Sequence, residues 1–154
     1  MTSPKPRSFE IVRPAPGDVI AIETAVGTRH AQVTHARSPY PDVVRAIRPR
    51  SDAQSPEEIA KGETAFVAMV ELGRAMRDQS VTVTVIGHAT VPAADRNFPT
   101  FRLPIRNKAG ETIYWWTWDG DSLSVASDGT DSLMPIREIL PSNALQERLA
   151  ELST

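Results

Sequence analysis

The chain has 154 residues, a length that suits one domain with a substantial core. Its formal net charge of −2 argues against general nucleic-acid binding, which normally needs an excess of Lys and Arg. The absence of cysteine excludes disulfides, thiolate nucleophiles and zinc–thiolate sites, and no apolar run is long enough to span a bilayer. The chain also lacks the apolar stretch of a signal peptide, so we expect a cytoplasmic protein.

The N-terminal third is expected to form short strands. Residues 1–13 form a loose segment, in which 9–13 can be a short edge strand, and residues 14–152 form a single β-rich domain. Gly27 joins the first two strands as a hairpin. The strands expected before the first helix are 18–24, 28–35 and 43–48.

A short internal helix is predicted from its start signals. Ser55 is an N-cap, Pro56 takes the first helical position and Glu58 completes a capping box, while Gly62 can end the helix. Residues 64–72 fit either a helical face or a buried strand, and we favour the strand.

The middle of the chain adds two more strands. Residues 80–87, SVTVTVIG, alternate Val and Thr and give the clearest strand. Residues 98–106 are interrupted by Pro104, which favours an edge strand. Ser142 is expected to cap a final helix over 143–152.

Residues 111–127, ETIYWWTWDGDSLSVAS, predict a β-hairpin. Asp119-Gly120 between two β-prone runs is typical of a type I′ turn. That turn pairs Trp116 with Leu123 and Tyr114 with Val125 on a face that we expect to be core. Trp115 and Thr117 then lie on the opposite, solvent face.

Many short strands with one brief internal helix and a C-terminal helix predict a mainly β (α+β) fold. We expect a strongly bent antiparallel sheet or a small open barrel.

Trp115 is the most informative residue for function. Another element, such as the C-terminal helix, can cover it; alternatively it stays at least half exposed and anchors a partner protein. In the second interpretation its neighbours in the binding patch are acidic and polar side chains. They are Glu111, Thr117, Asp119 and Asp121.

The sequence gives no strong sign of catalysis or of a metal or cofactor site. His30 and His35 point to opposite faces of a predicted strand, and His88 has no second ligand nearby. Asp119 and Asp121 flank a glycine, as a tight turn requires. The five arginines between residues 29 and 50 have only Tyr40 as a stacking platform, so a solvated basic face is favoured over a nucleic-acid site.

Several motifs in order resemble the Immunity protein 26 family. They are the early strand at Gly17, Asp18, Val19, Ala21 and Ile22, the VIGH stretch at 85–88, FPTF at 98–101, the aromatic strand and turn at 114–120, and the Leu-, Glu- and Arg-rich helix at 144–149. The match runs from about residue 14 to 150. The resemblance implies a small bacterial protein that neutralises a toxin of a polymorphic toxin system, with no catalytic residues to assign.

Three functions therefore stay open. The first is a non-enzymatic immunity protein that occludes a cognate toxin with an aromatic patch and an acidic rim. The second is a small-molecule-binding or hydrolytic enzyme in a barrel mouth, which would use His88 or His35 with Asp18. The third is a structural or regulatory homodimer joined through an edge strand.

Overall fold

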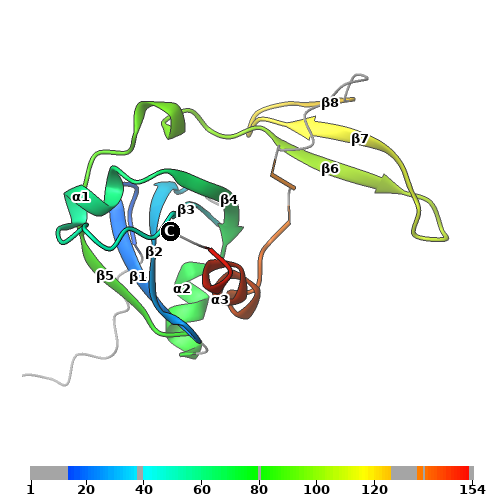
Figure 1. The fold of residues 1–154 in the computed structure, drawn as a ribbon. Helices are drawn as coiled ribbons and strands as arrows, with labels where there is room; N and C mark the ends of the chain where they lie inside the picture. The colour runs from blue at the N-terminus through cyan, green and yellow to red at the C-terminus, as the bar shows by residue number, and fades with distance from the viewer. Residues whose placement is uncertain (1–13, 38–39, 80, 126–134, 137, 153–154) are drawn as a thin grey trace, which may run out of the picture.

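The structure, a computed structural model, describes residues 14–37, 40–79, 81–125, 135–136 and 138–152. In this part of the chain eight strands form two antiparallel sheets, accompanied by three α-helices and a 3₁₀ turn (Figure 1). The expected mainly β fold is confirmed, and the sheets do not close into a barrel.

Sheet A has five strands in the order β4-β3-β2-β1-β5. Strands β1 to β4 are sequential antiparallel neighbours, and the chain then crosses through α2 (Leu72–Asp78) to place β5 beside β1. The predicted hairpin at Gly27 is confirmed. The strands are β1 (Asp18–Thr24), β2 (Gly27–His35), β3 (Asp42–Ile47), β4 (Thr64–Val70) and β5 (Val83–His88).

One face of sheet A carries the main core. Alternation along the strands points Ile20, Ile22 and Val44 to this face. Leu145 and Leu149 of α3 (Ser142–Ala150) pack on them, together with Leu72 of α2. Sheet A and its helices are called the body below.

The opposite face of sheet A is covered in two places. Ile59 of α1 (Pro56–Ala60) packs on Val19 and Ile47. Farther along, four buried side chains form what we call the base cluster, which joins sheet A to the second sheet. They are Val43, Met69, Phe101 and Trp118.

Sheet B projects from the body. It consists of β6 (Phe101–Arg106), β7 (Thr112–Trp118) and β8 (Leu123–Val125), in the order β6-β7-β8. The base cluster holds the end of sheet B nearest the body, and the turn between β6 and β7 lies at the far end (Figure 1). After β8 the chain returns past Arg102, whose N–H bonds the carbonyl of Pro135, and reaches α3.

The helix predictions are confirmed in part. The Ser55 side chain caps α1 by accepting from the N–H of Glu58, and residues 64–70 form a strand, as favoured. Ser142 is wrong as a cap, because Pro141 occupies the N-cap position and its carbonyl accepts the first helical bond.

Helix α2 and some strand limits differ from expectation. No helix was expected at 72–78, although Leu, Arg, Ala and Met all favour one. Strand β5 starts at Val83 and β6 at Phe101, each three residues later than expected. The strand proposed at 9–13 lies outside the described residues.

The predicted pairing of β7 with β8 is wrong by two residues. Trp118 pairs with Leu123 and Trp116 with Val125, and the turn is centred on Gly120-Asp121. The cause is Asp119, whose side chain accepts bonds from the N–H groups of Asp121 and Ser122 and so occupies the first position of the turn. A two-residue shift leaves every side chain on its predicted face.

We expect Phe101→Ala to lower the free energy of unfolding by about 3–5 kcal/mol, because it empties a fully buried site in the base cluster. Tyr114→Ala on the same face of sheet B is the matched control. Tyr114 is 44% exposed, so its loss should cost about 1 kcal/mol or less. Urea unfolding followed by circular dichroism measures both, and equal losses would contradict the base cluster as the anchor.

Candidate protein-binding site

The five residues predicted for the binding patch lie in three places on sheet B. Trp115 and Thr117 share one face of β7, Glu111 precedes this strand, and Asp119 and Asp121 lie in the turn that follows it. Eight residues of extended chain separate Glu111 from Asp119, roughly 26 Å at ~3.3 Å per residue. The predicted acidic ring around Trp115 is therefore not assembled.

Trp115 matches neither of the two expected alternatives. It is partly buried, and the group that covers it is Arg102 of the neighbouring strand, whose guanidinium carbon lies 4.5 Å from the ring centroid. Such stacking stabilises both groups where the ring is partly desolvated. Trp115 is thus held in place by a cation on its own sheet.

The turn between β7 and β8 is fixed to the body. Asp121 lies 3.4 Å from Arg37, and the Arg37 guanidinium also stacks on Phe98 at 4.8 Å. Gly120 has φ +96°, and a Cβ placed there would lie 2.6 Å from Arg37 Nη1 and 2.8 Å from the Phe98 ring. This turn therefore requires glycine both for its backbone conformation and for its close contacts.

The opposite side of sheet B is a continuous apolar face. Cross-strand pairing aligns Phe101 with Trp118, Leu103 with Trp116 and Ile105 with Tyr114, while Leu123 and Val125 extend the same face onto β8. Phe101 and Trp118 are buried in the base cluster. Beyond them Tyr114, Leu123 and Val125 are 44%, 49% and 62% exposed.

This apolar face differs from expectation in its burial. Its members were assigned to the core, and alternation placed them together correctly. In the described residues, however, Phe101 and Trp118 are buried, Leu103, Ile105 and Trp116 are only partly buried, and the remaining members are exposed. The Trp116 Nε1–H is buried without a hydrogen-bond acceptor in the described part of the chain. Of the nine large apolar side chains that the described residues expose, four belong to sheet B: Ile113, Tyr114, Leu123 and Val125.

Residues 111–125 contain acidic side chains and no Lys or Arg, but basic side chains from other segments lie near them. Arg37 pairs with Asp121 from the body, and Arg102 and Arg106 come from β6 alongside. Hydrogen bonds from the backbone N–H groups of Ser122 and Asp121 hold the pKa of Asp119 below its usual value. The described surface of sheet B is mixed in charge and apolar at its centre.

The enzyme hypothesis paired either His88 or His35 with Asp18, and the structure brings only His88 to this carboxylate. His88 Nδ1 lies 3.1 Å from Asp18 Oδ1, so one of the two predicted pairs is present. His35 instead contacts Thr34 Oγ1 and the carbonyl of Arg96. Burial and the nearby Arg29 lower the pKa of His30. The other carboxylate oxygen of Asp18 accepts from the N–H of Ala15, and His88 is mostly exposed.

A buried arginine, which no sequence pattern singled out, forms a hydrogen-bond network on the face of sheet A opposite the main core. Arg45 is fully buried, and its guanidinium donates to Gln32 Oε1 at 2.9 Å, Thr64 Oγ1 at 3.0 Å and the carbonyls of Gly62 and Ala60. Burial lowers its pKa, partly offset by Asp95, which accepts from Thr64. Gln32 in turn donates to the carbonyls of residues 17 and 89. Because all of these acceptors are groups of the protein itself, we assign the network a role in holding the fold together.

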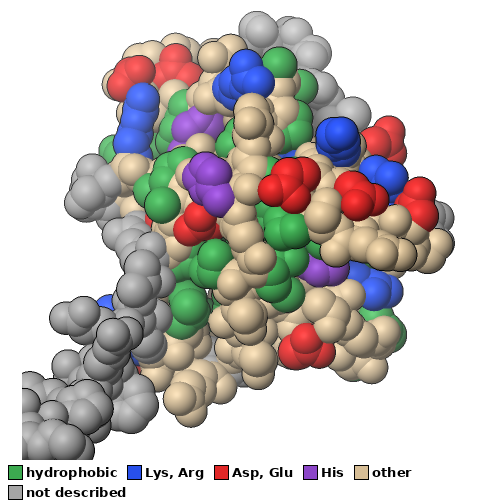
Figure 2. Space-filling view, turned by 90° about the vertical axis from the view of Figure 1, so that its left-hand side faces the viewer, with side chains coloured by type: hydrophobic (Ala, Val, Ile, Leu, Met, Phe, Trp, Pro, Cys, Tyr) green, Lys and Arg blue, Asp and Glu red, His purple; other side chains and the backbone are tan. Residues whose placement is uncertain are grey.

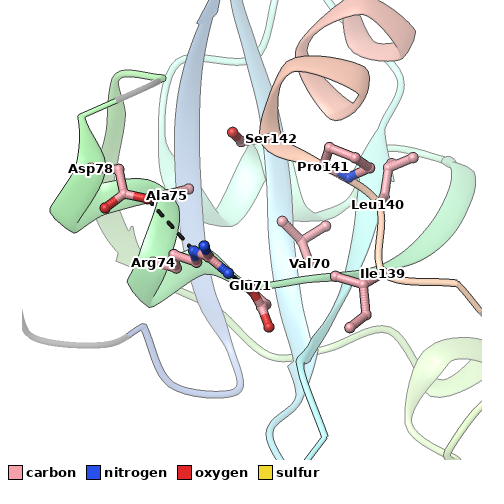
Figure 3. A pocket seen from close by; sticks show the side chains of 9 residues that line it. All are labelled: Val70, Glu71, Arg74, Ala75, Asp78, Ile139, Leu140, Pro141 and Ser142. Carbon is pink, nitrogen blue, oxygen red and sulfur yellow. Dashed lines mark hydrogen bonds and ion pairs between the residues drawn. The ribbon is translucent and has the colours of Figure 1, made fainter.

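Two cavities in the described part of the chain are lined by charged side chains. One of about 280 Å³ lies between α2 and the start of α3, with Arg74 held 3.5 Å from Glu71 and 3.7 Å from Asp78 (Figure 3). Another of about 590 Å³ lies beside α1 and combines Lys61 and Arg96 with Glu57 and small apolar residues. Neither contains a histidine.

Within the described ranges, no group of three or more His, Asp or Glu side chains could hold a metal ion. No helix in those ranges has the length and apolar character needed to cross a bilayer.

We expect Gly120→Ala to destabilise the protein by about 2 kcal/mol or more, because both the positive φ and the contacts with Arg37 and Phe98 oppose a Cβ. Gly110→Ala is the matched control, since Gly110 also has a positive φ but no atom within 4 Å of where its new methyl group would lie. Its cost should be about 1 kcal/mol. Thermal unfolding compares the two, and a larger loss for Gly110→Ala would refute the docked turn.

Asp119 should titrate below the ordinary aspartate value of 3.8. Its depressed pKa means that its contribution to the turn is fully present above this value. The contribution is lost as the pH falls through the lower, folded-state pKa. The chemical shift of the Asp119 carboxyl carbon gives the midpoint directly, and a midpoint at or above 3.8 would show that the side chain does not cap the turn.

Comparison of the chain with protein-family models, with curated proteins and with solved structures found no match.

Proposed function

We propose that this chain is a non-enzymatic, cytoplasmic protein-binding module whose contact surface is sheet B. The observation that carries the proposal is the apolar face, which continues beyond the base cluster with Tyr114, Leu123 and Val125 between 44% and 62% exposed. Contiguous exposed apolar surface on a folded domain typically marks an interaction site.

The anchoring of sheet B supports the same proposal. A sheet whose near end is packed into the body presents its far end in a fixed orientation, which lowers the entropy lost on binding. Trp115 and Thr117 lie on the face of sheet B opposite the apolar face, where a partner that contacts both faces can reach them. Tryptophan side chains such as Trp115 are frequent binding hot spots.

The motif resemblance to the Immunity protein 26 family makes a bacterial toxin the proposed partner. In this mechanism the chain occludes the toxin by steric contact. The net charge of −2, with Glu111 and Asp119 on sheet B, favours a basic toxin surface. Such electrostatics mainly raises the association rate and weakens with salt.

Leu123→Lys should weaken binding at least tenfold, because it places a charge on the apolar face. Trp115→Ala and Asp121→Lys should impair neutralisation more mildly while the fold survives. Val26→Lys is the matched control, since Val26 is 58% exposed but lies in the turn between β1 and β2. The assay is growth rescue of cells that express the toxic domain of a secreted protein encoded beside this gene.

Rescue by Leu123→Lys equal to that of the parent would place the contact surface elsewhere. Failure of the parent to rescue growth, or a neighbourhood without any such toxin gene, would contradict the immunity function itself. Circular dichroism of each variant separates loss of binding from loss of folding.

A further inference from the structure

We propose that the free edge of β5 is a pairing site for a second copy of this chain. In this arrangement the two β5 strands lie antiparallel across a two-fold axis near Thr84 and join two copies of sheet A. This inference is independent of the toxin-binding proposal, which concerns sheet B.

The hydrogen bonds between β1 and β5 reveal which backbone groups face outward. The N–H of Glu23 donates to the carbonyl of Thr82, and Ala21 pairs with Thr84. In an antiparallel ladder the bonding direction alternates, so Val83 and Val85 direct their N–H and C=O groups away from β1. No described residue pairs with these groups.

The other sheet edges are covered or interrupted, and β5 differs from them. The carbonyl of Met69 in β4 accepts from the N–H of Leu140, the N–H of Arg102 in β6 donates to Pro135, and Pro104 interrupts β6. The third such edge, β8, has three residues in the described part of the chain. Strand β5 contains no Pro, Lys, Arg, Asp or Glu, which are the residues that usually protect an edge from pairing.

The β5 edge is also apolar at the surface. Val85 and Ile86 are 41% and 37% exposed, and Val83 packs against the main core. In the view toward the side where β5 and α1 lie, apolar side chains reach the surface in the middle of the face (Figure 2). A second strand beside β5 would therefore continue both the ladder and the apolar packing of sheet A.

The register follows from these constraints. The regular ladder between β1 and β5 runs from Val83 to Val85, because a β-bulge at Ile86 shifts the register before Gly87. A two-fold axis at Thr84 pairs each Val83 with the Val85 of the other copy and satisfies the outward groups of both residues reciprocally. An uncharged strand has no like-charge repulsion against its own copy, which favours a second copy over a charged partner.

Hydrogen exchange of the parent protein tests the pairing without mutation. The amides of Val83 and Val85 should exchange more slowly at millimolar than at micromolar concentration, while that of Thr84, which bonds toward β1, should change less. Exchange that is fast at both concentrations would mean a free edge. Exchange that is slow at both, in a protein that sediments as a monomer at micromolar concentration, would mean an intramolecular occupant. Either result overturns the proposal.

Sedimentation equilibrium gives the second readout. The parent mass should rise from 16.9 kDa toward twice that value with concentration. Val85→Lys should raise the dissociation constant at least tenfold, whereas the matched Val125→Lys on sheet B should leave it unchanged. The reverse pattern would place the dimer contact on sheet B, and a parent that stays monomeric throughout would exclude the dimer. A monomeric parent leaves the toxin-binding proposal untouched, whereas a dimer contact on sheet B would occupy the surface proposed for the toxin.

Discussion

The packing of Phe101 and Trp118 on Val43 and Met69 is the contact on which the functional account depends. It places the end of sheet B against the outer face of β3 and β4. The Trp118 ring lies 4.9 Å from Tyr40 and 5.3 Å from Phe98, in edge-on arrangements that add to simple burial. Burial of these side chains stabilises sheet B and its attachment to the body.

The anchoring has a consequence for the chemistry of the surface. The apolar face is one surface from the base cluster to Tyr114, and its buried end orients its exposed end. The turn at Gly120 also holds the buried end of the face, through its contacts with Arg37 and Phe98. Sheet B is therefore positioned as a unit, which suits recognition of a protein partner better than enclosure of a small substrate.

The body is held together by a buried hydrogen-bond network. The fully buried Arg45 and Gln32 donate to backbone carbonyls at the end of α1, just before β1 and just after β5. Removing one partner from such a network leaves buried groups unsatisfied.

Strand identities were predictable from the sequence because they follow from local alternation. The faces of Trp115 and Trp116 were right despite a wrong register, since the error was an even number of residues. The register itself depended on hydrogen bonds of the Asp119 side chain, which composition does not reveal. Helix α2 was missed because it is short and ends at Gln79 with φ 52°, where a glycine would have signalled its end.

The burial and the charge environment of the hairpin were harder to predict because they depend on distant segments. Tyr114 has a core pattern, yet the residues that could cover it are not local to the hairpin. Asp119 and Asp121 have no Lys or Arg close to them in sequence, but Arg37 and Arg102 approach the hairpin from other segments. The surface that we propose for binding lies on the hairpin that the sequence analysis singled out, but on the face opposite Trp115.

The most direct test of the central claim is the backbone order parameter along β6 and β7, measured by nitrogen-15 relaxation. We predict values near ~0.85, as in rigid backbone, from the base cluster through the pair formed by Leu103 and Trp116. Values below ~0.6 at this pair, with sheet A rigid, would show that sheet B moves independently of the body and would contradict a fixed binding surface.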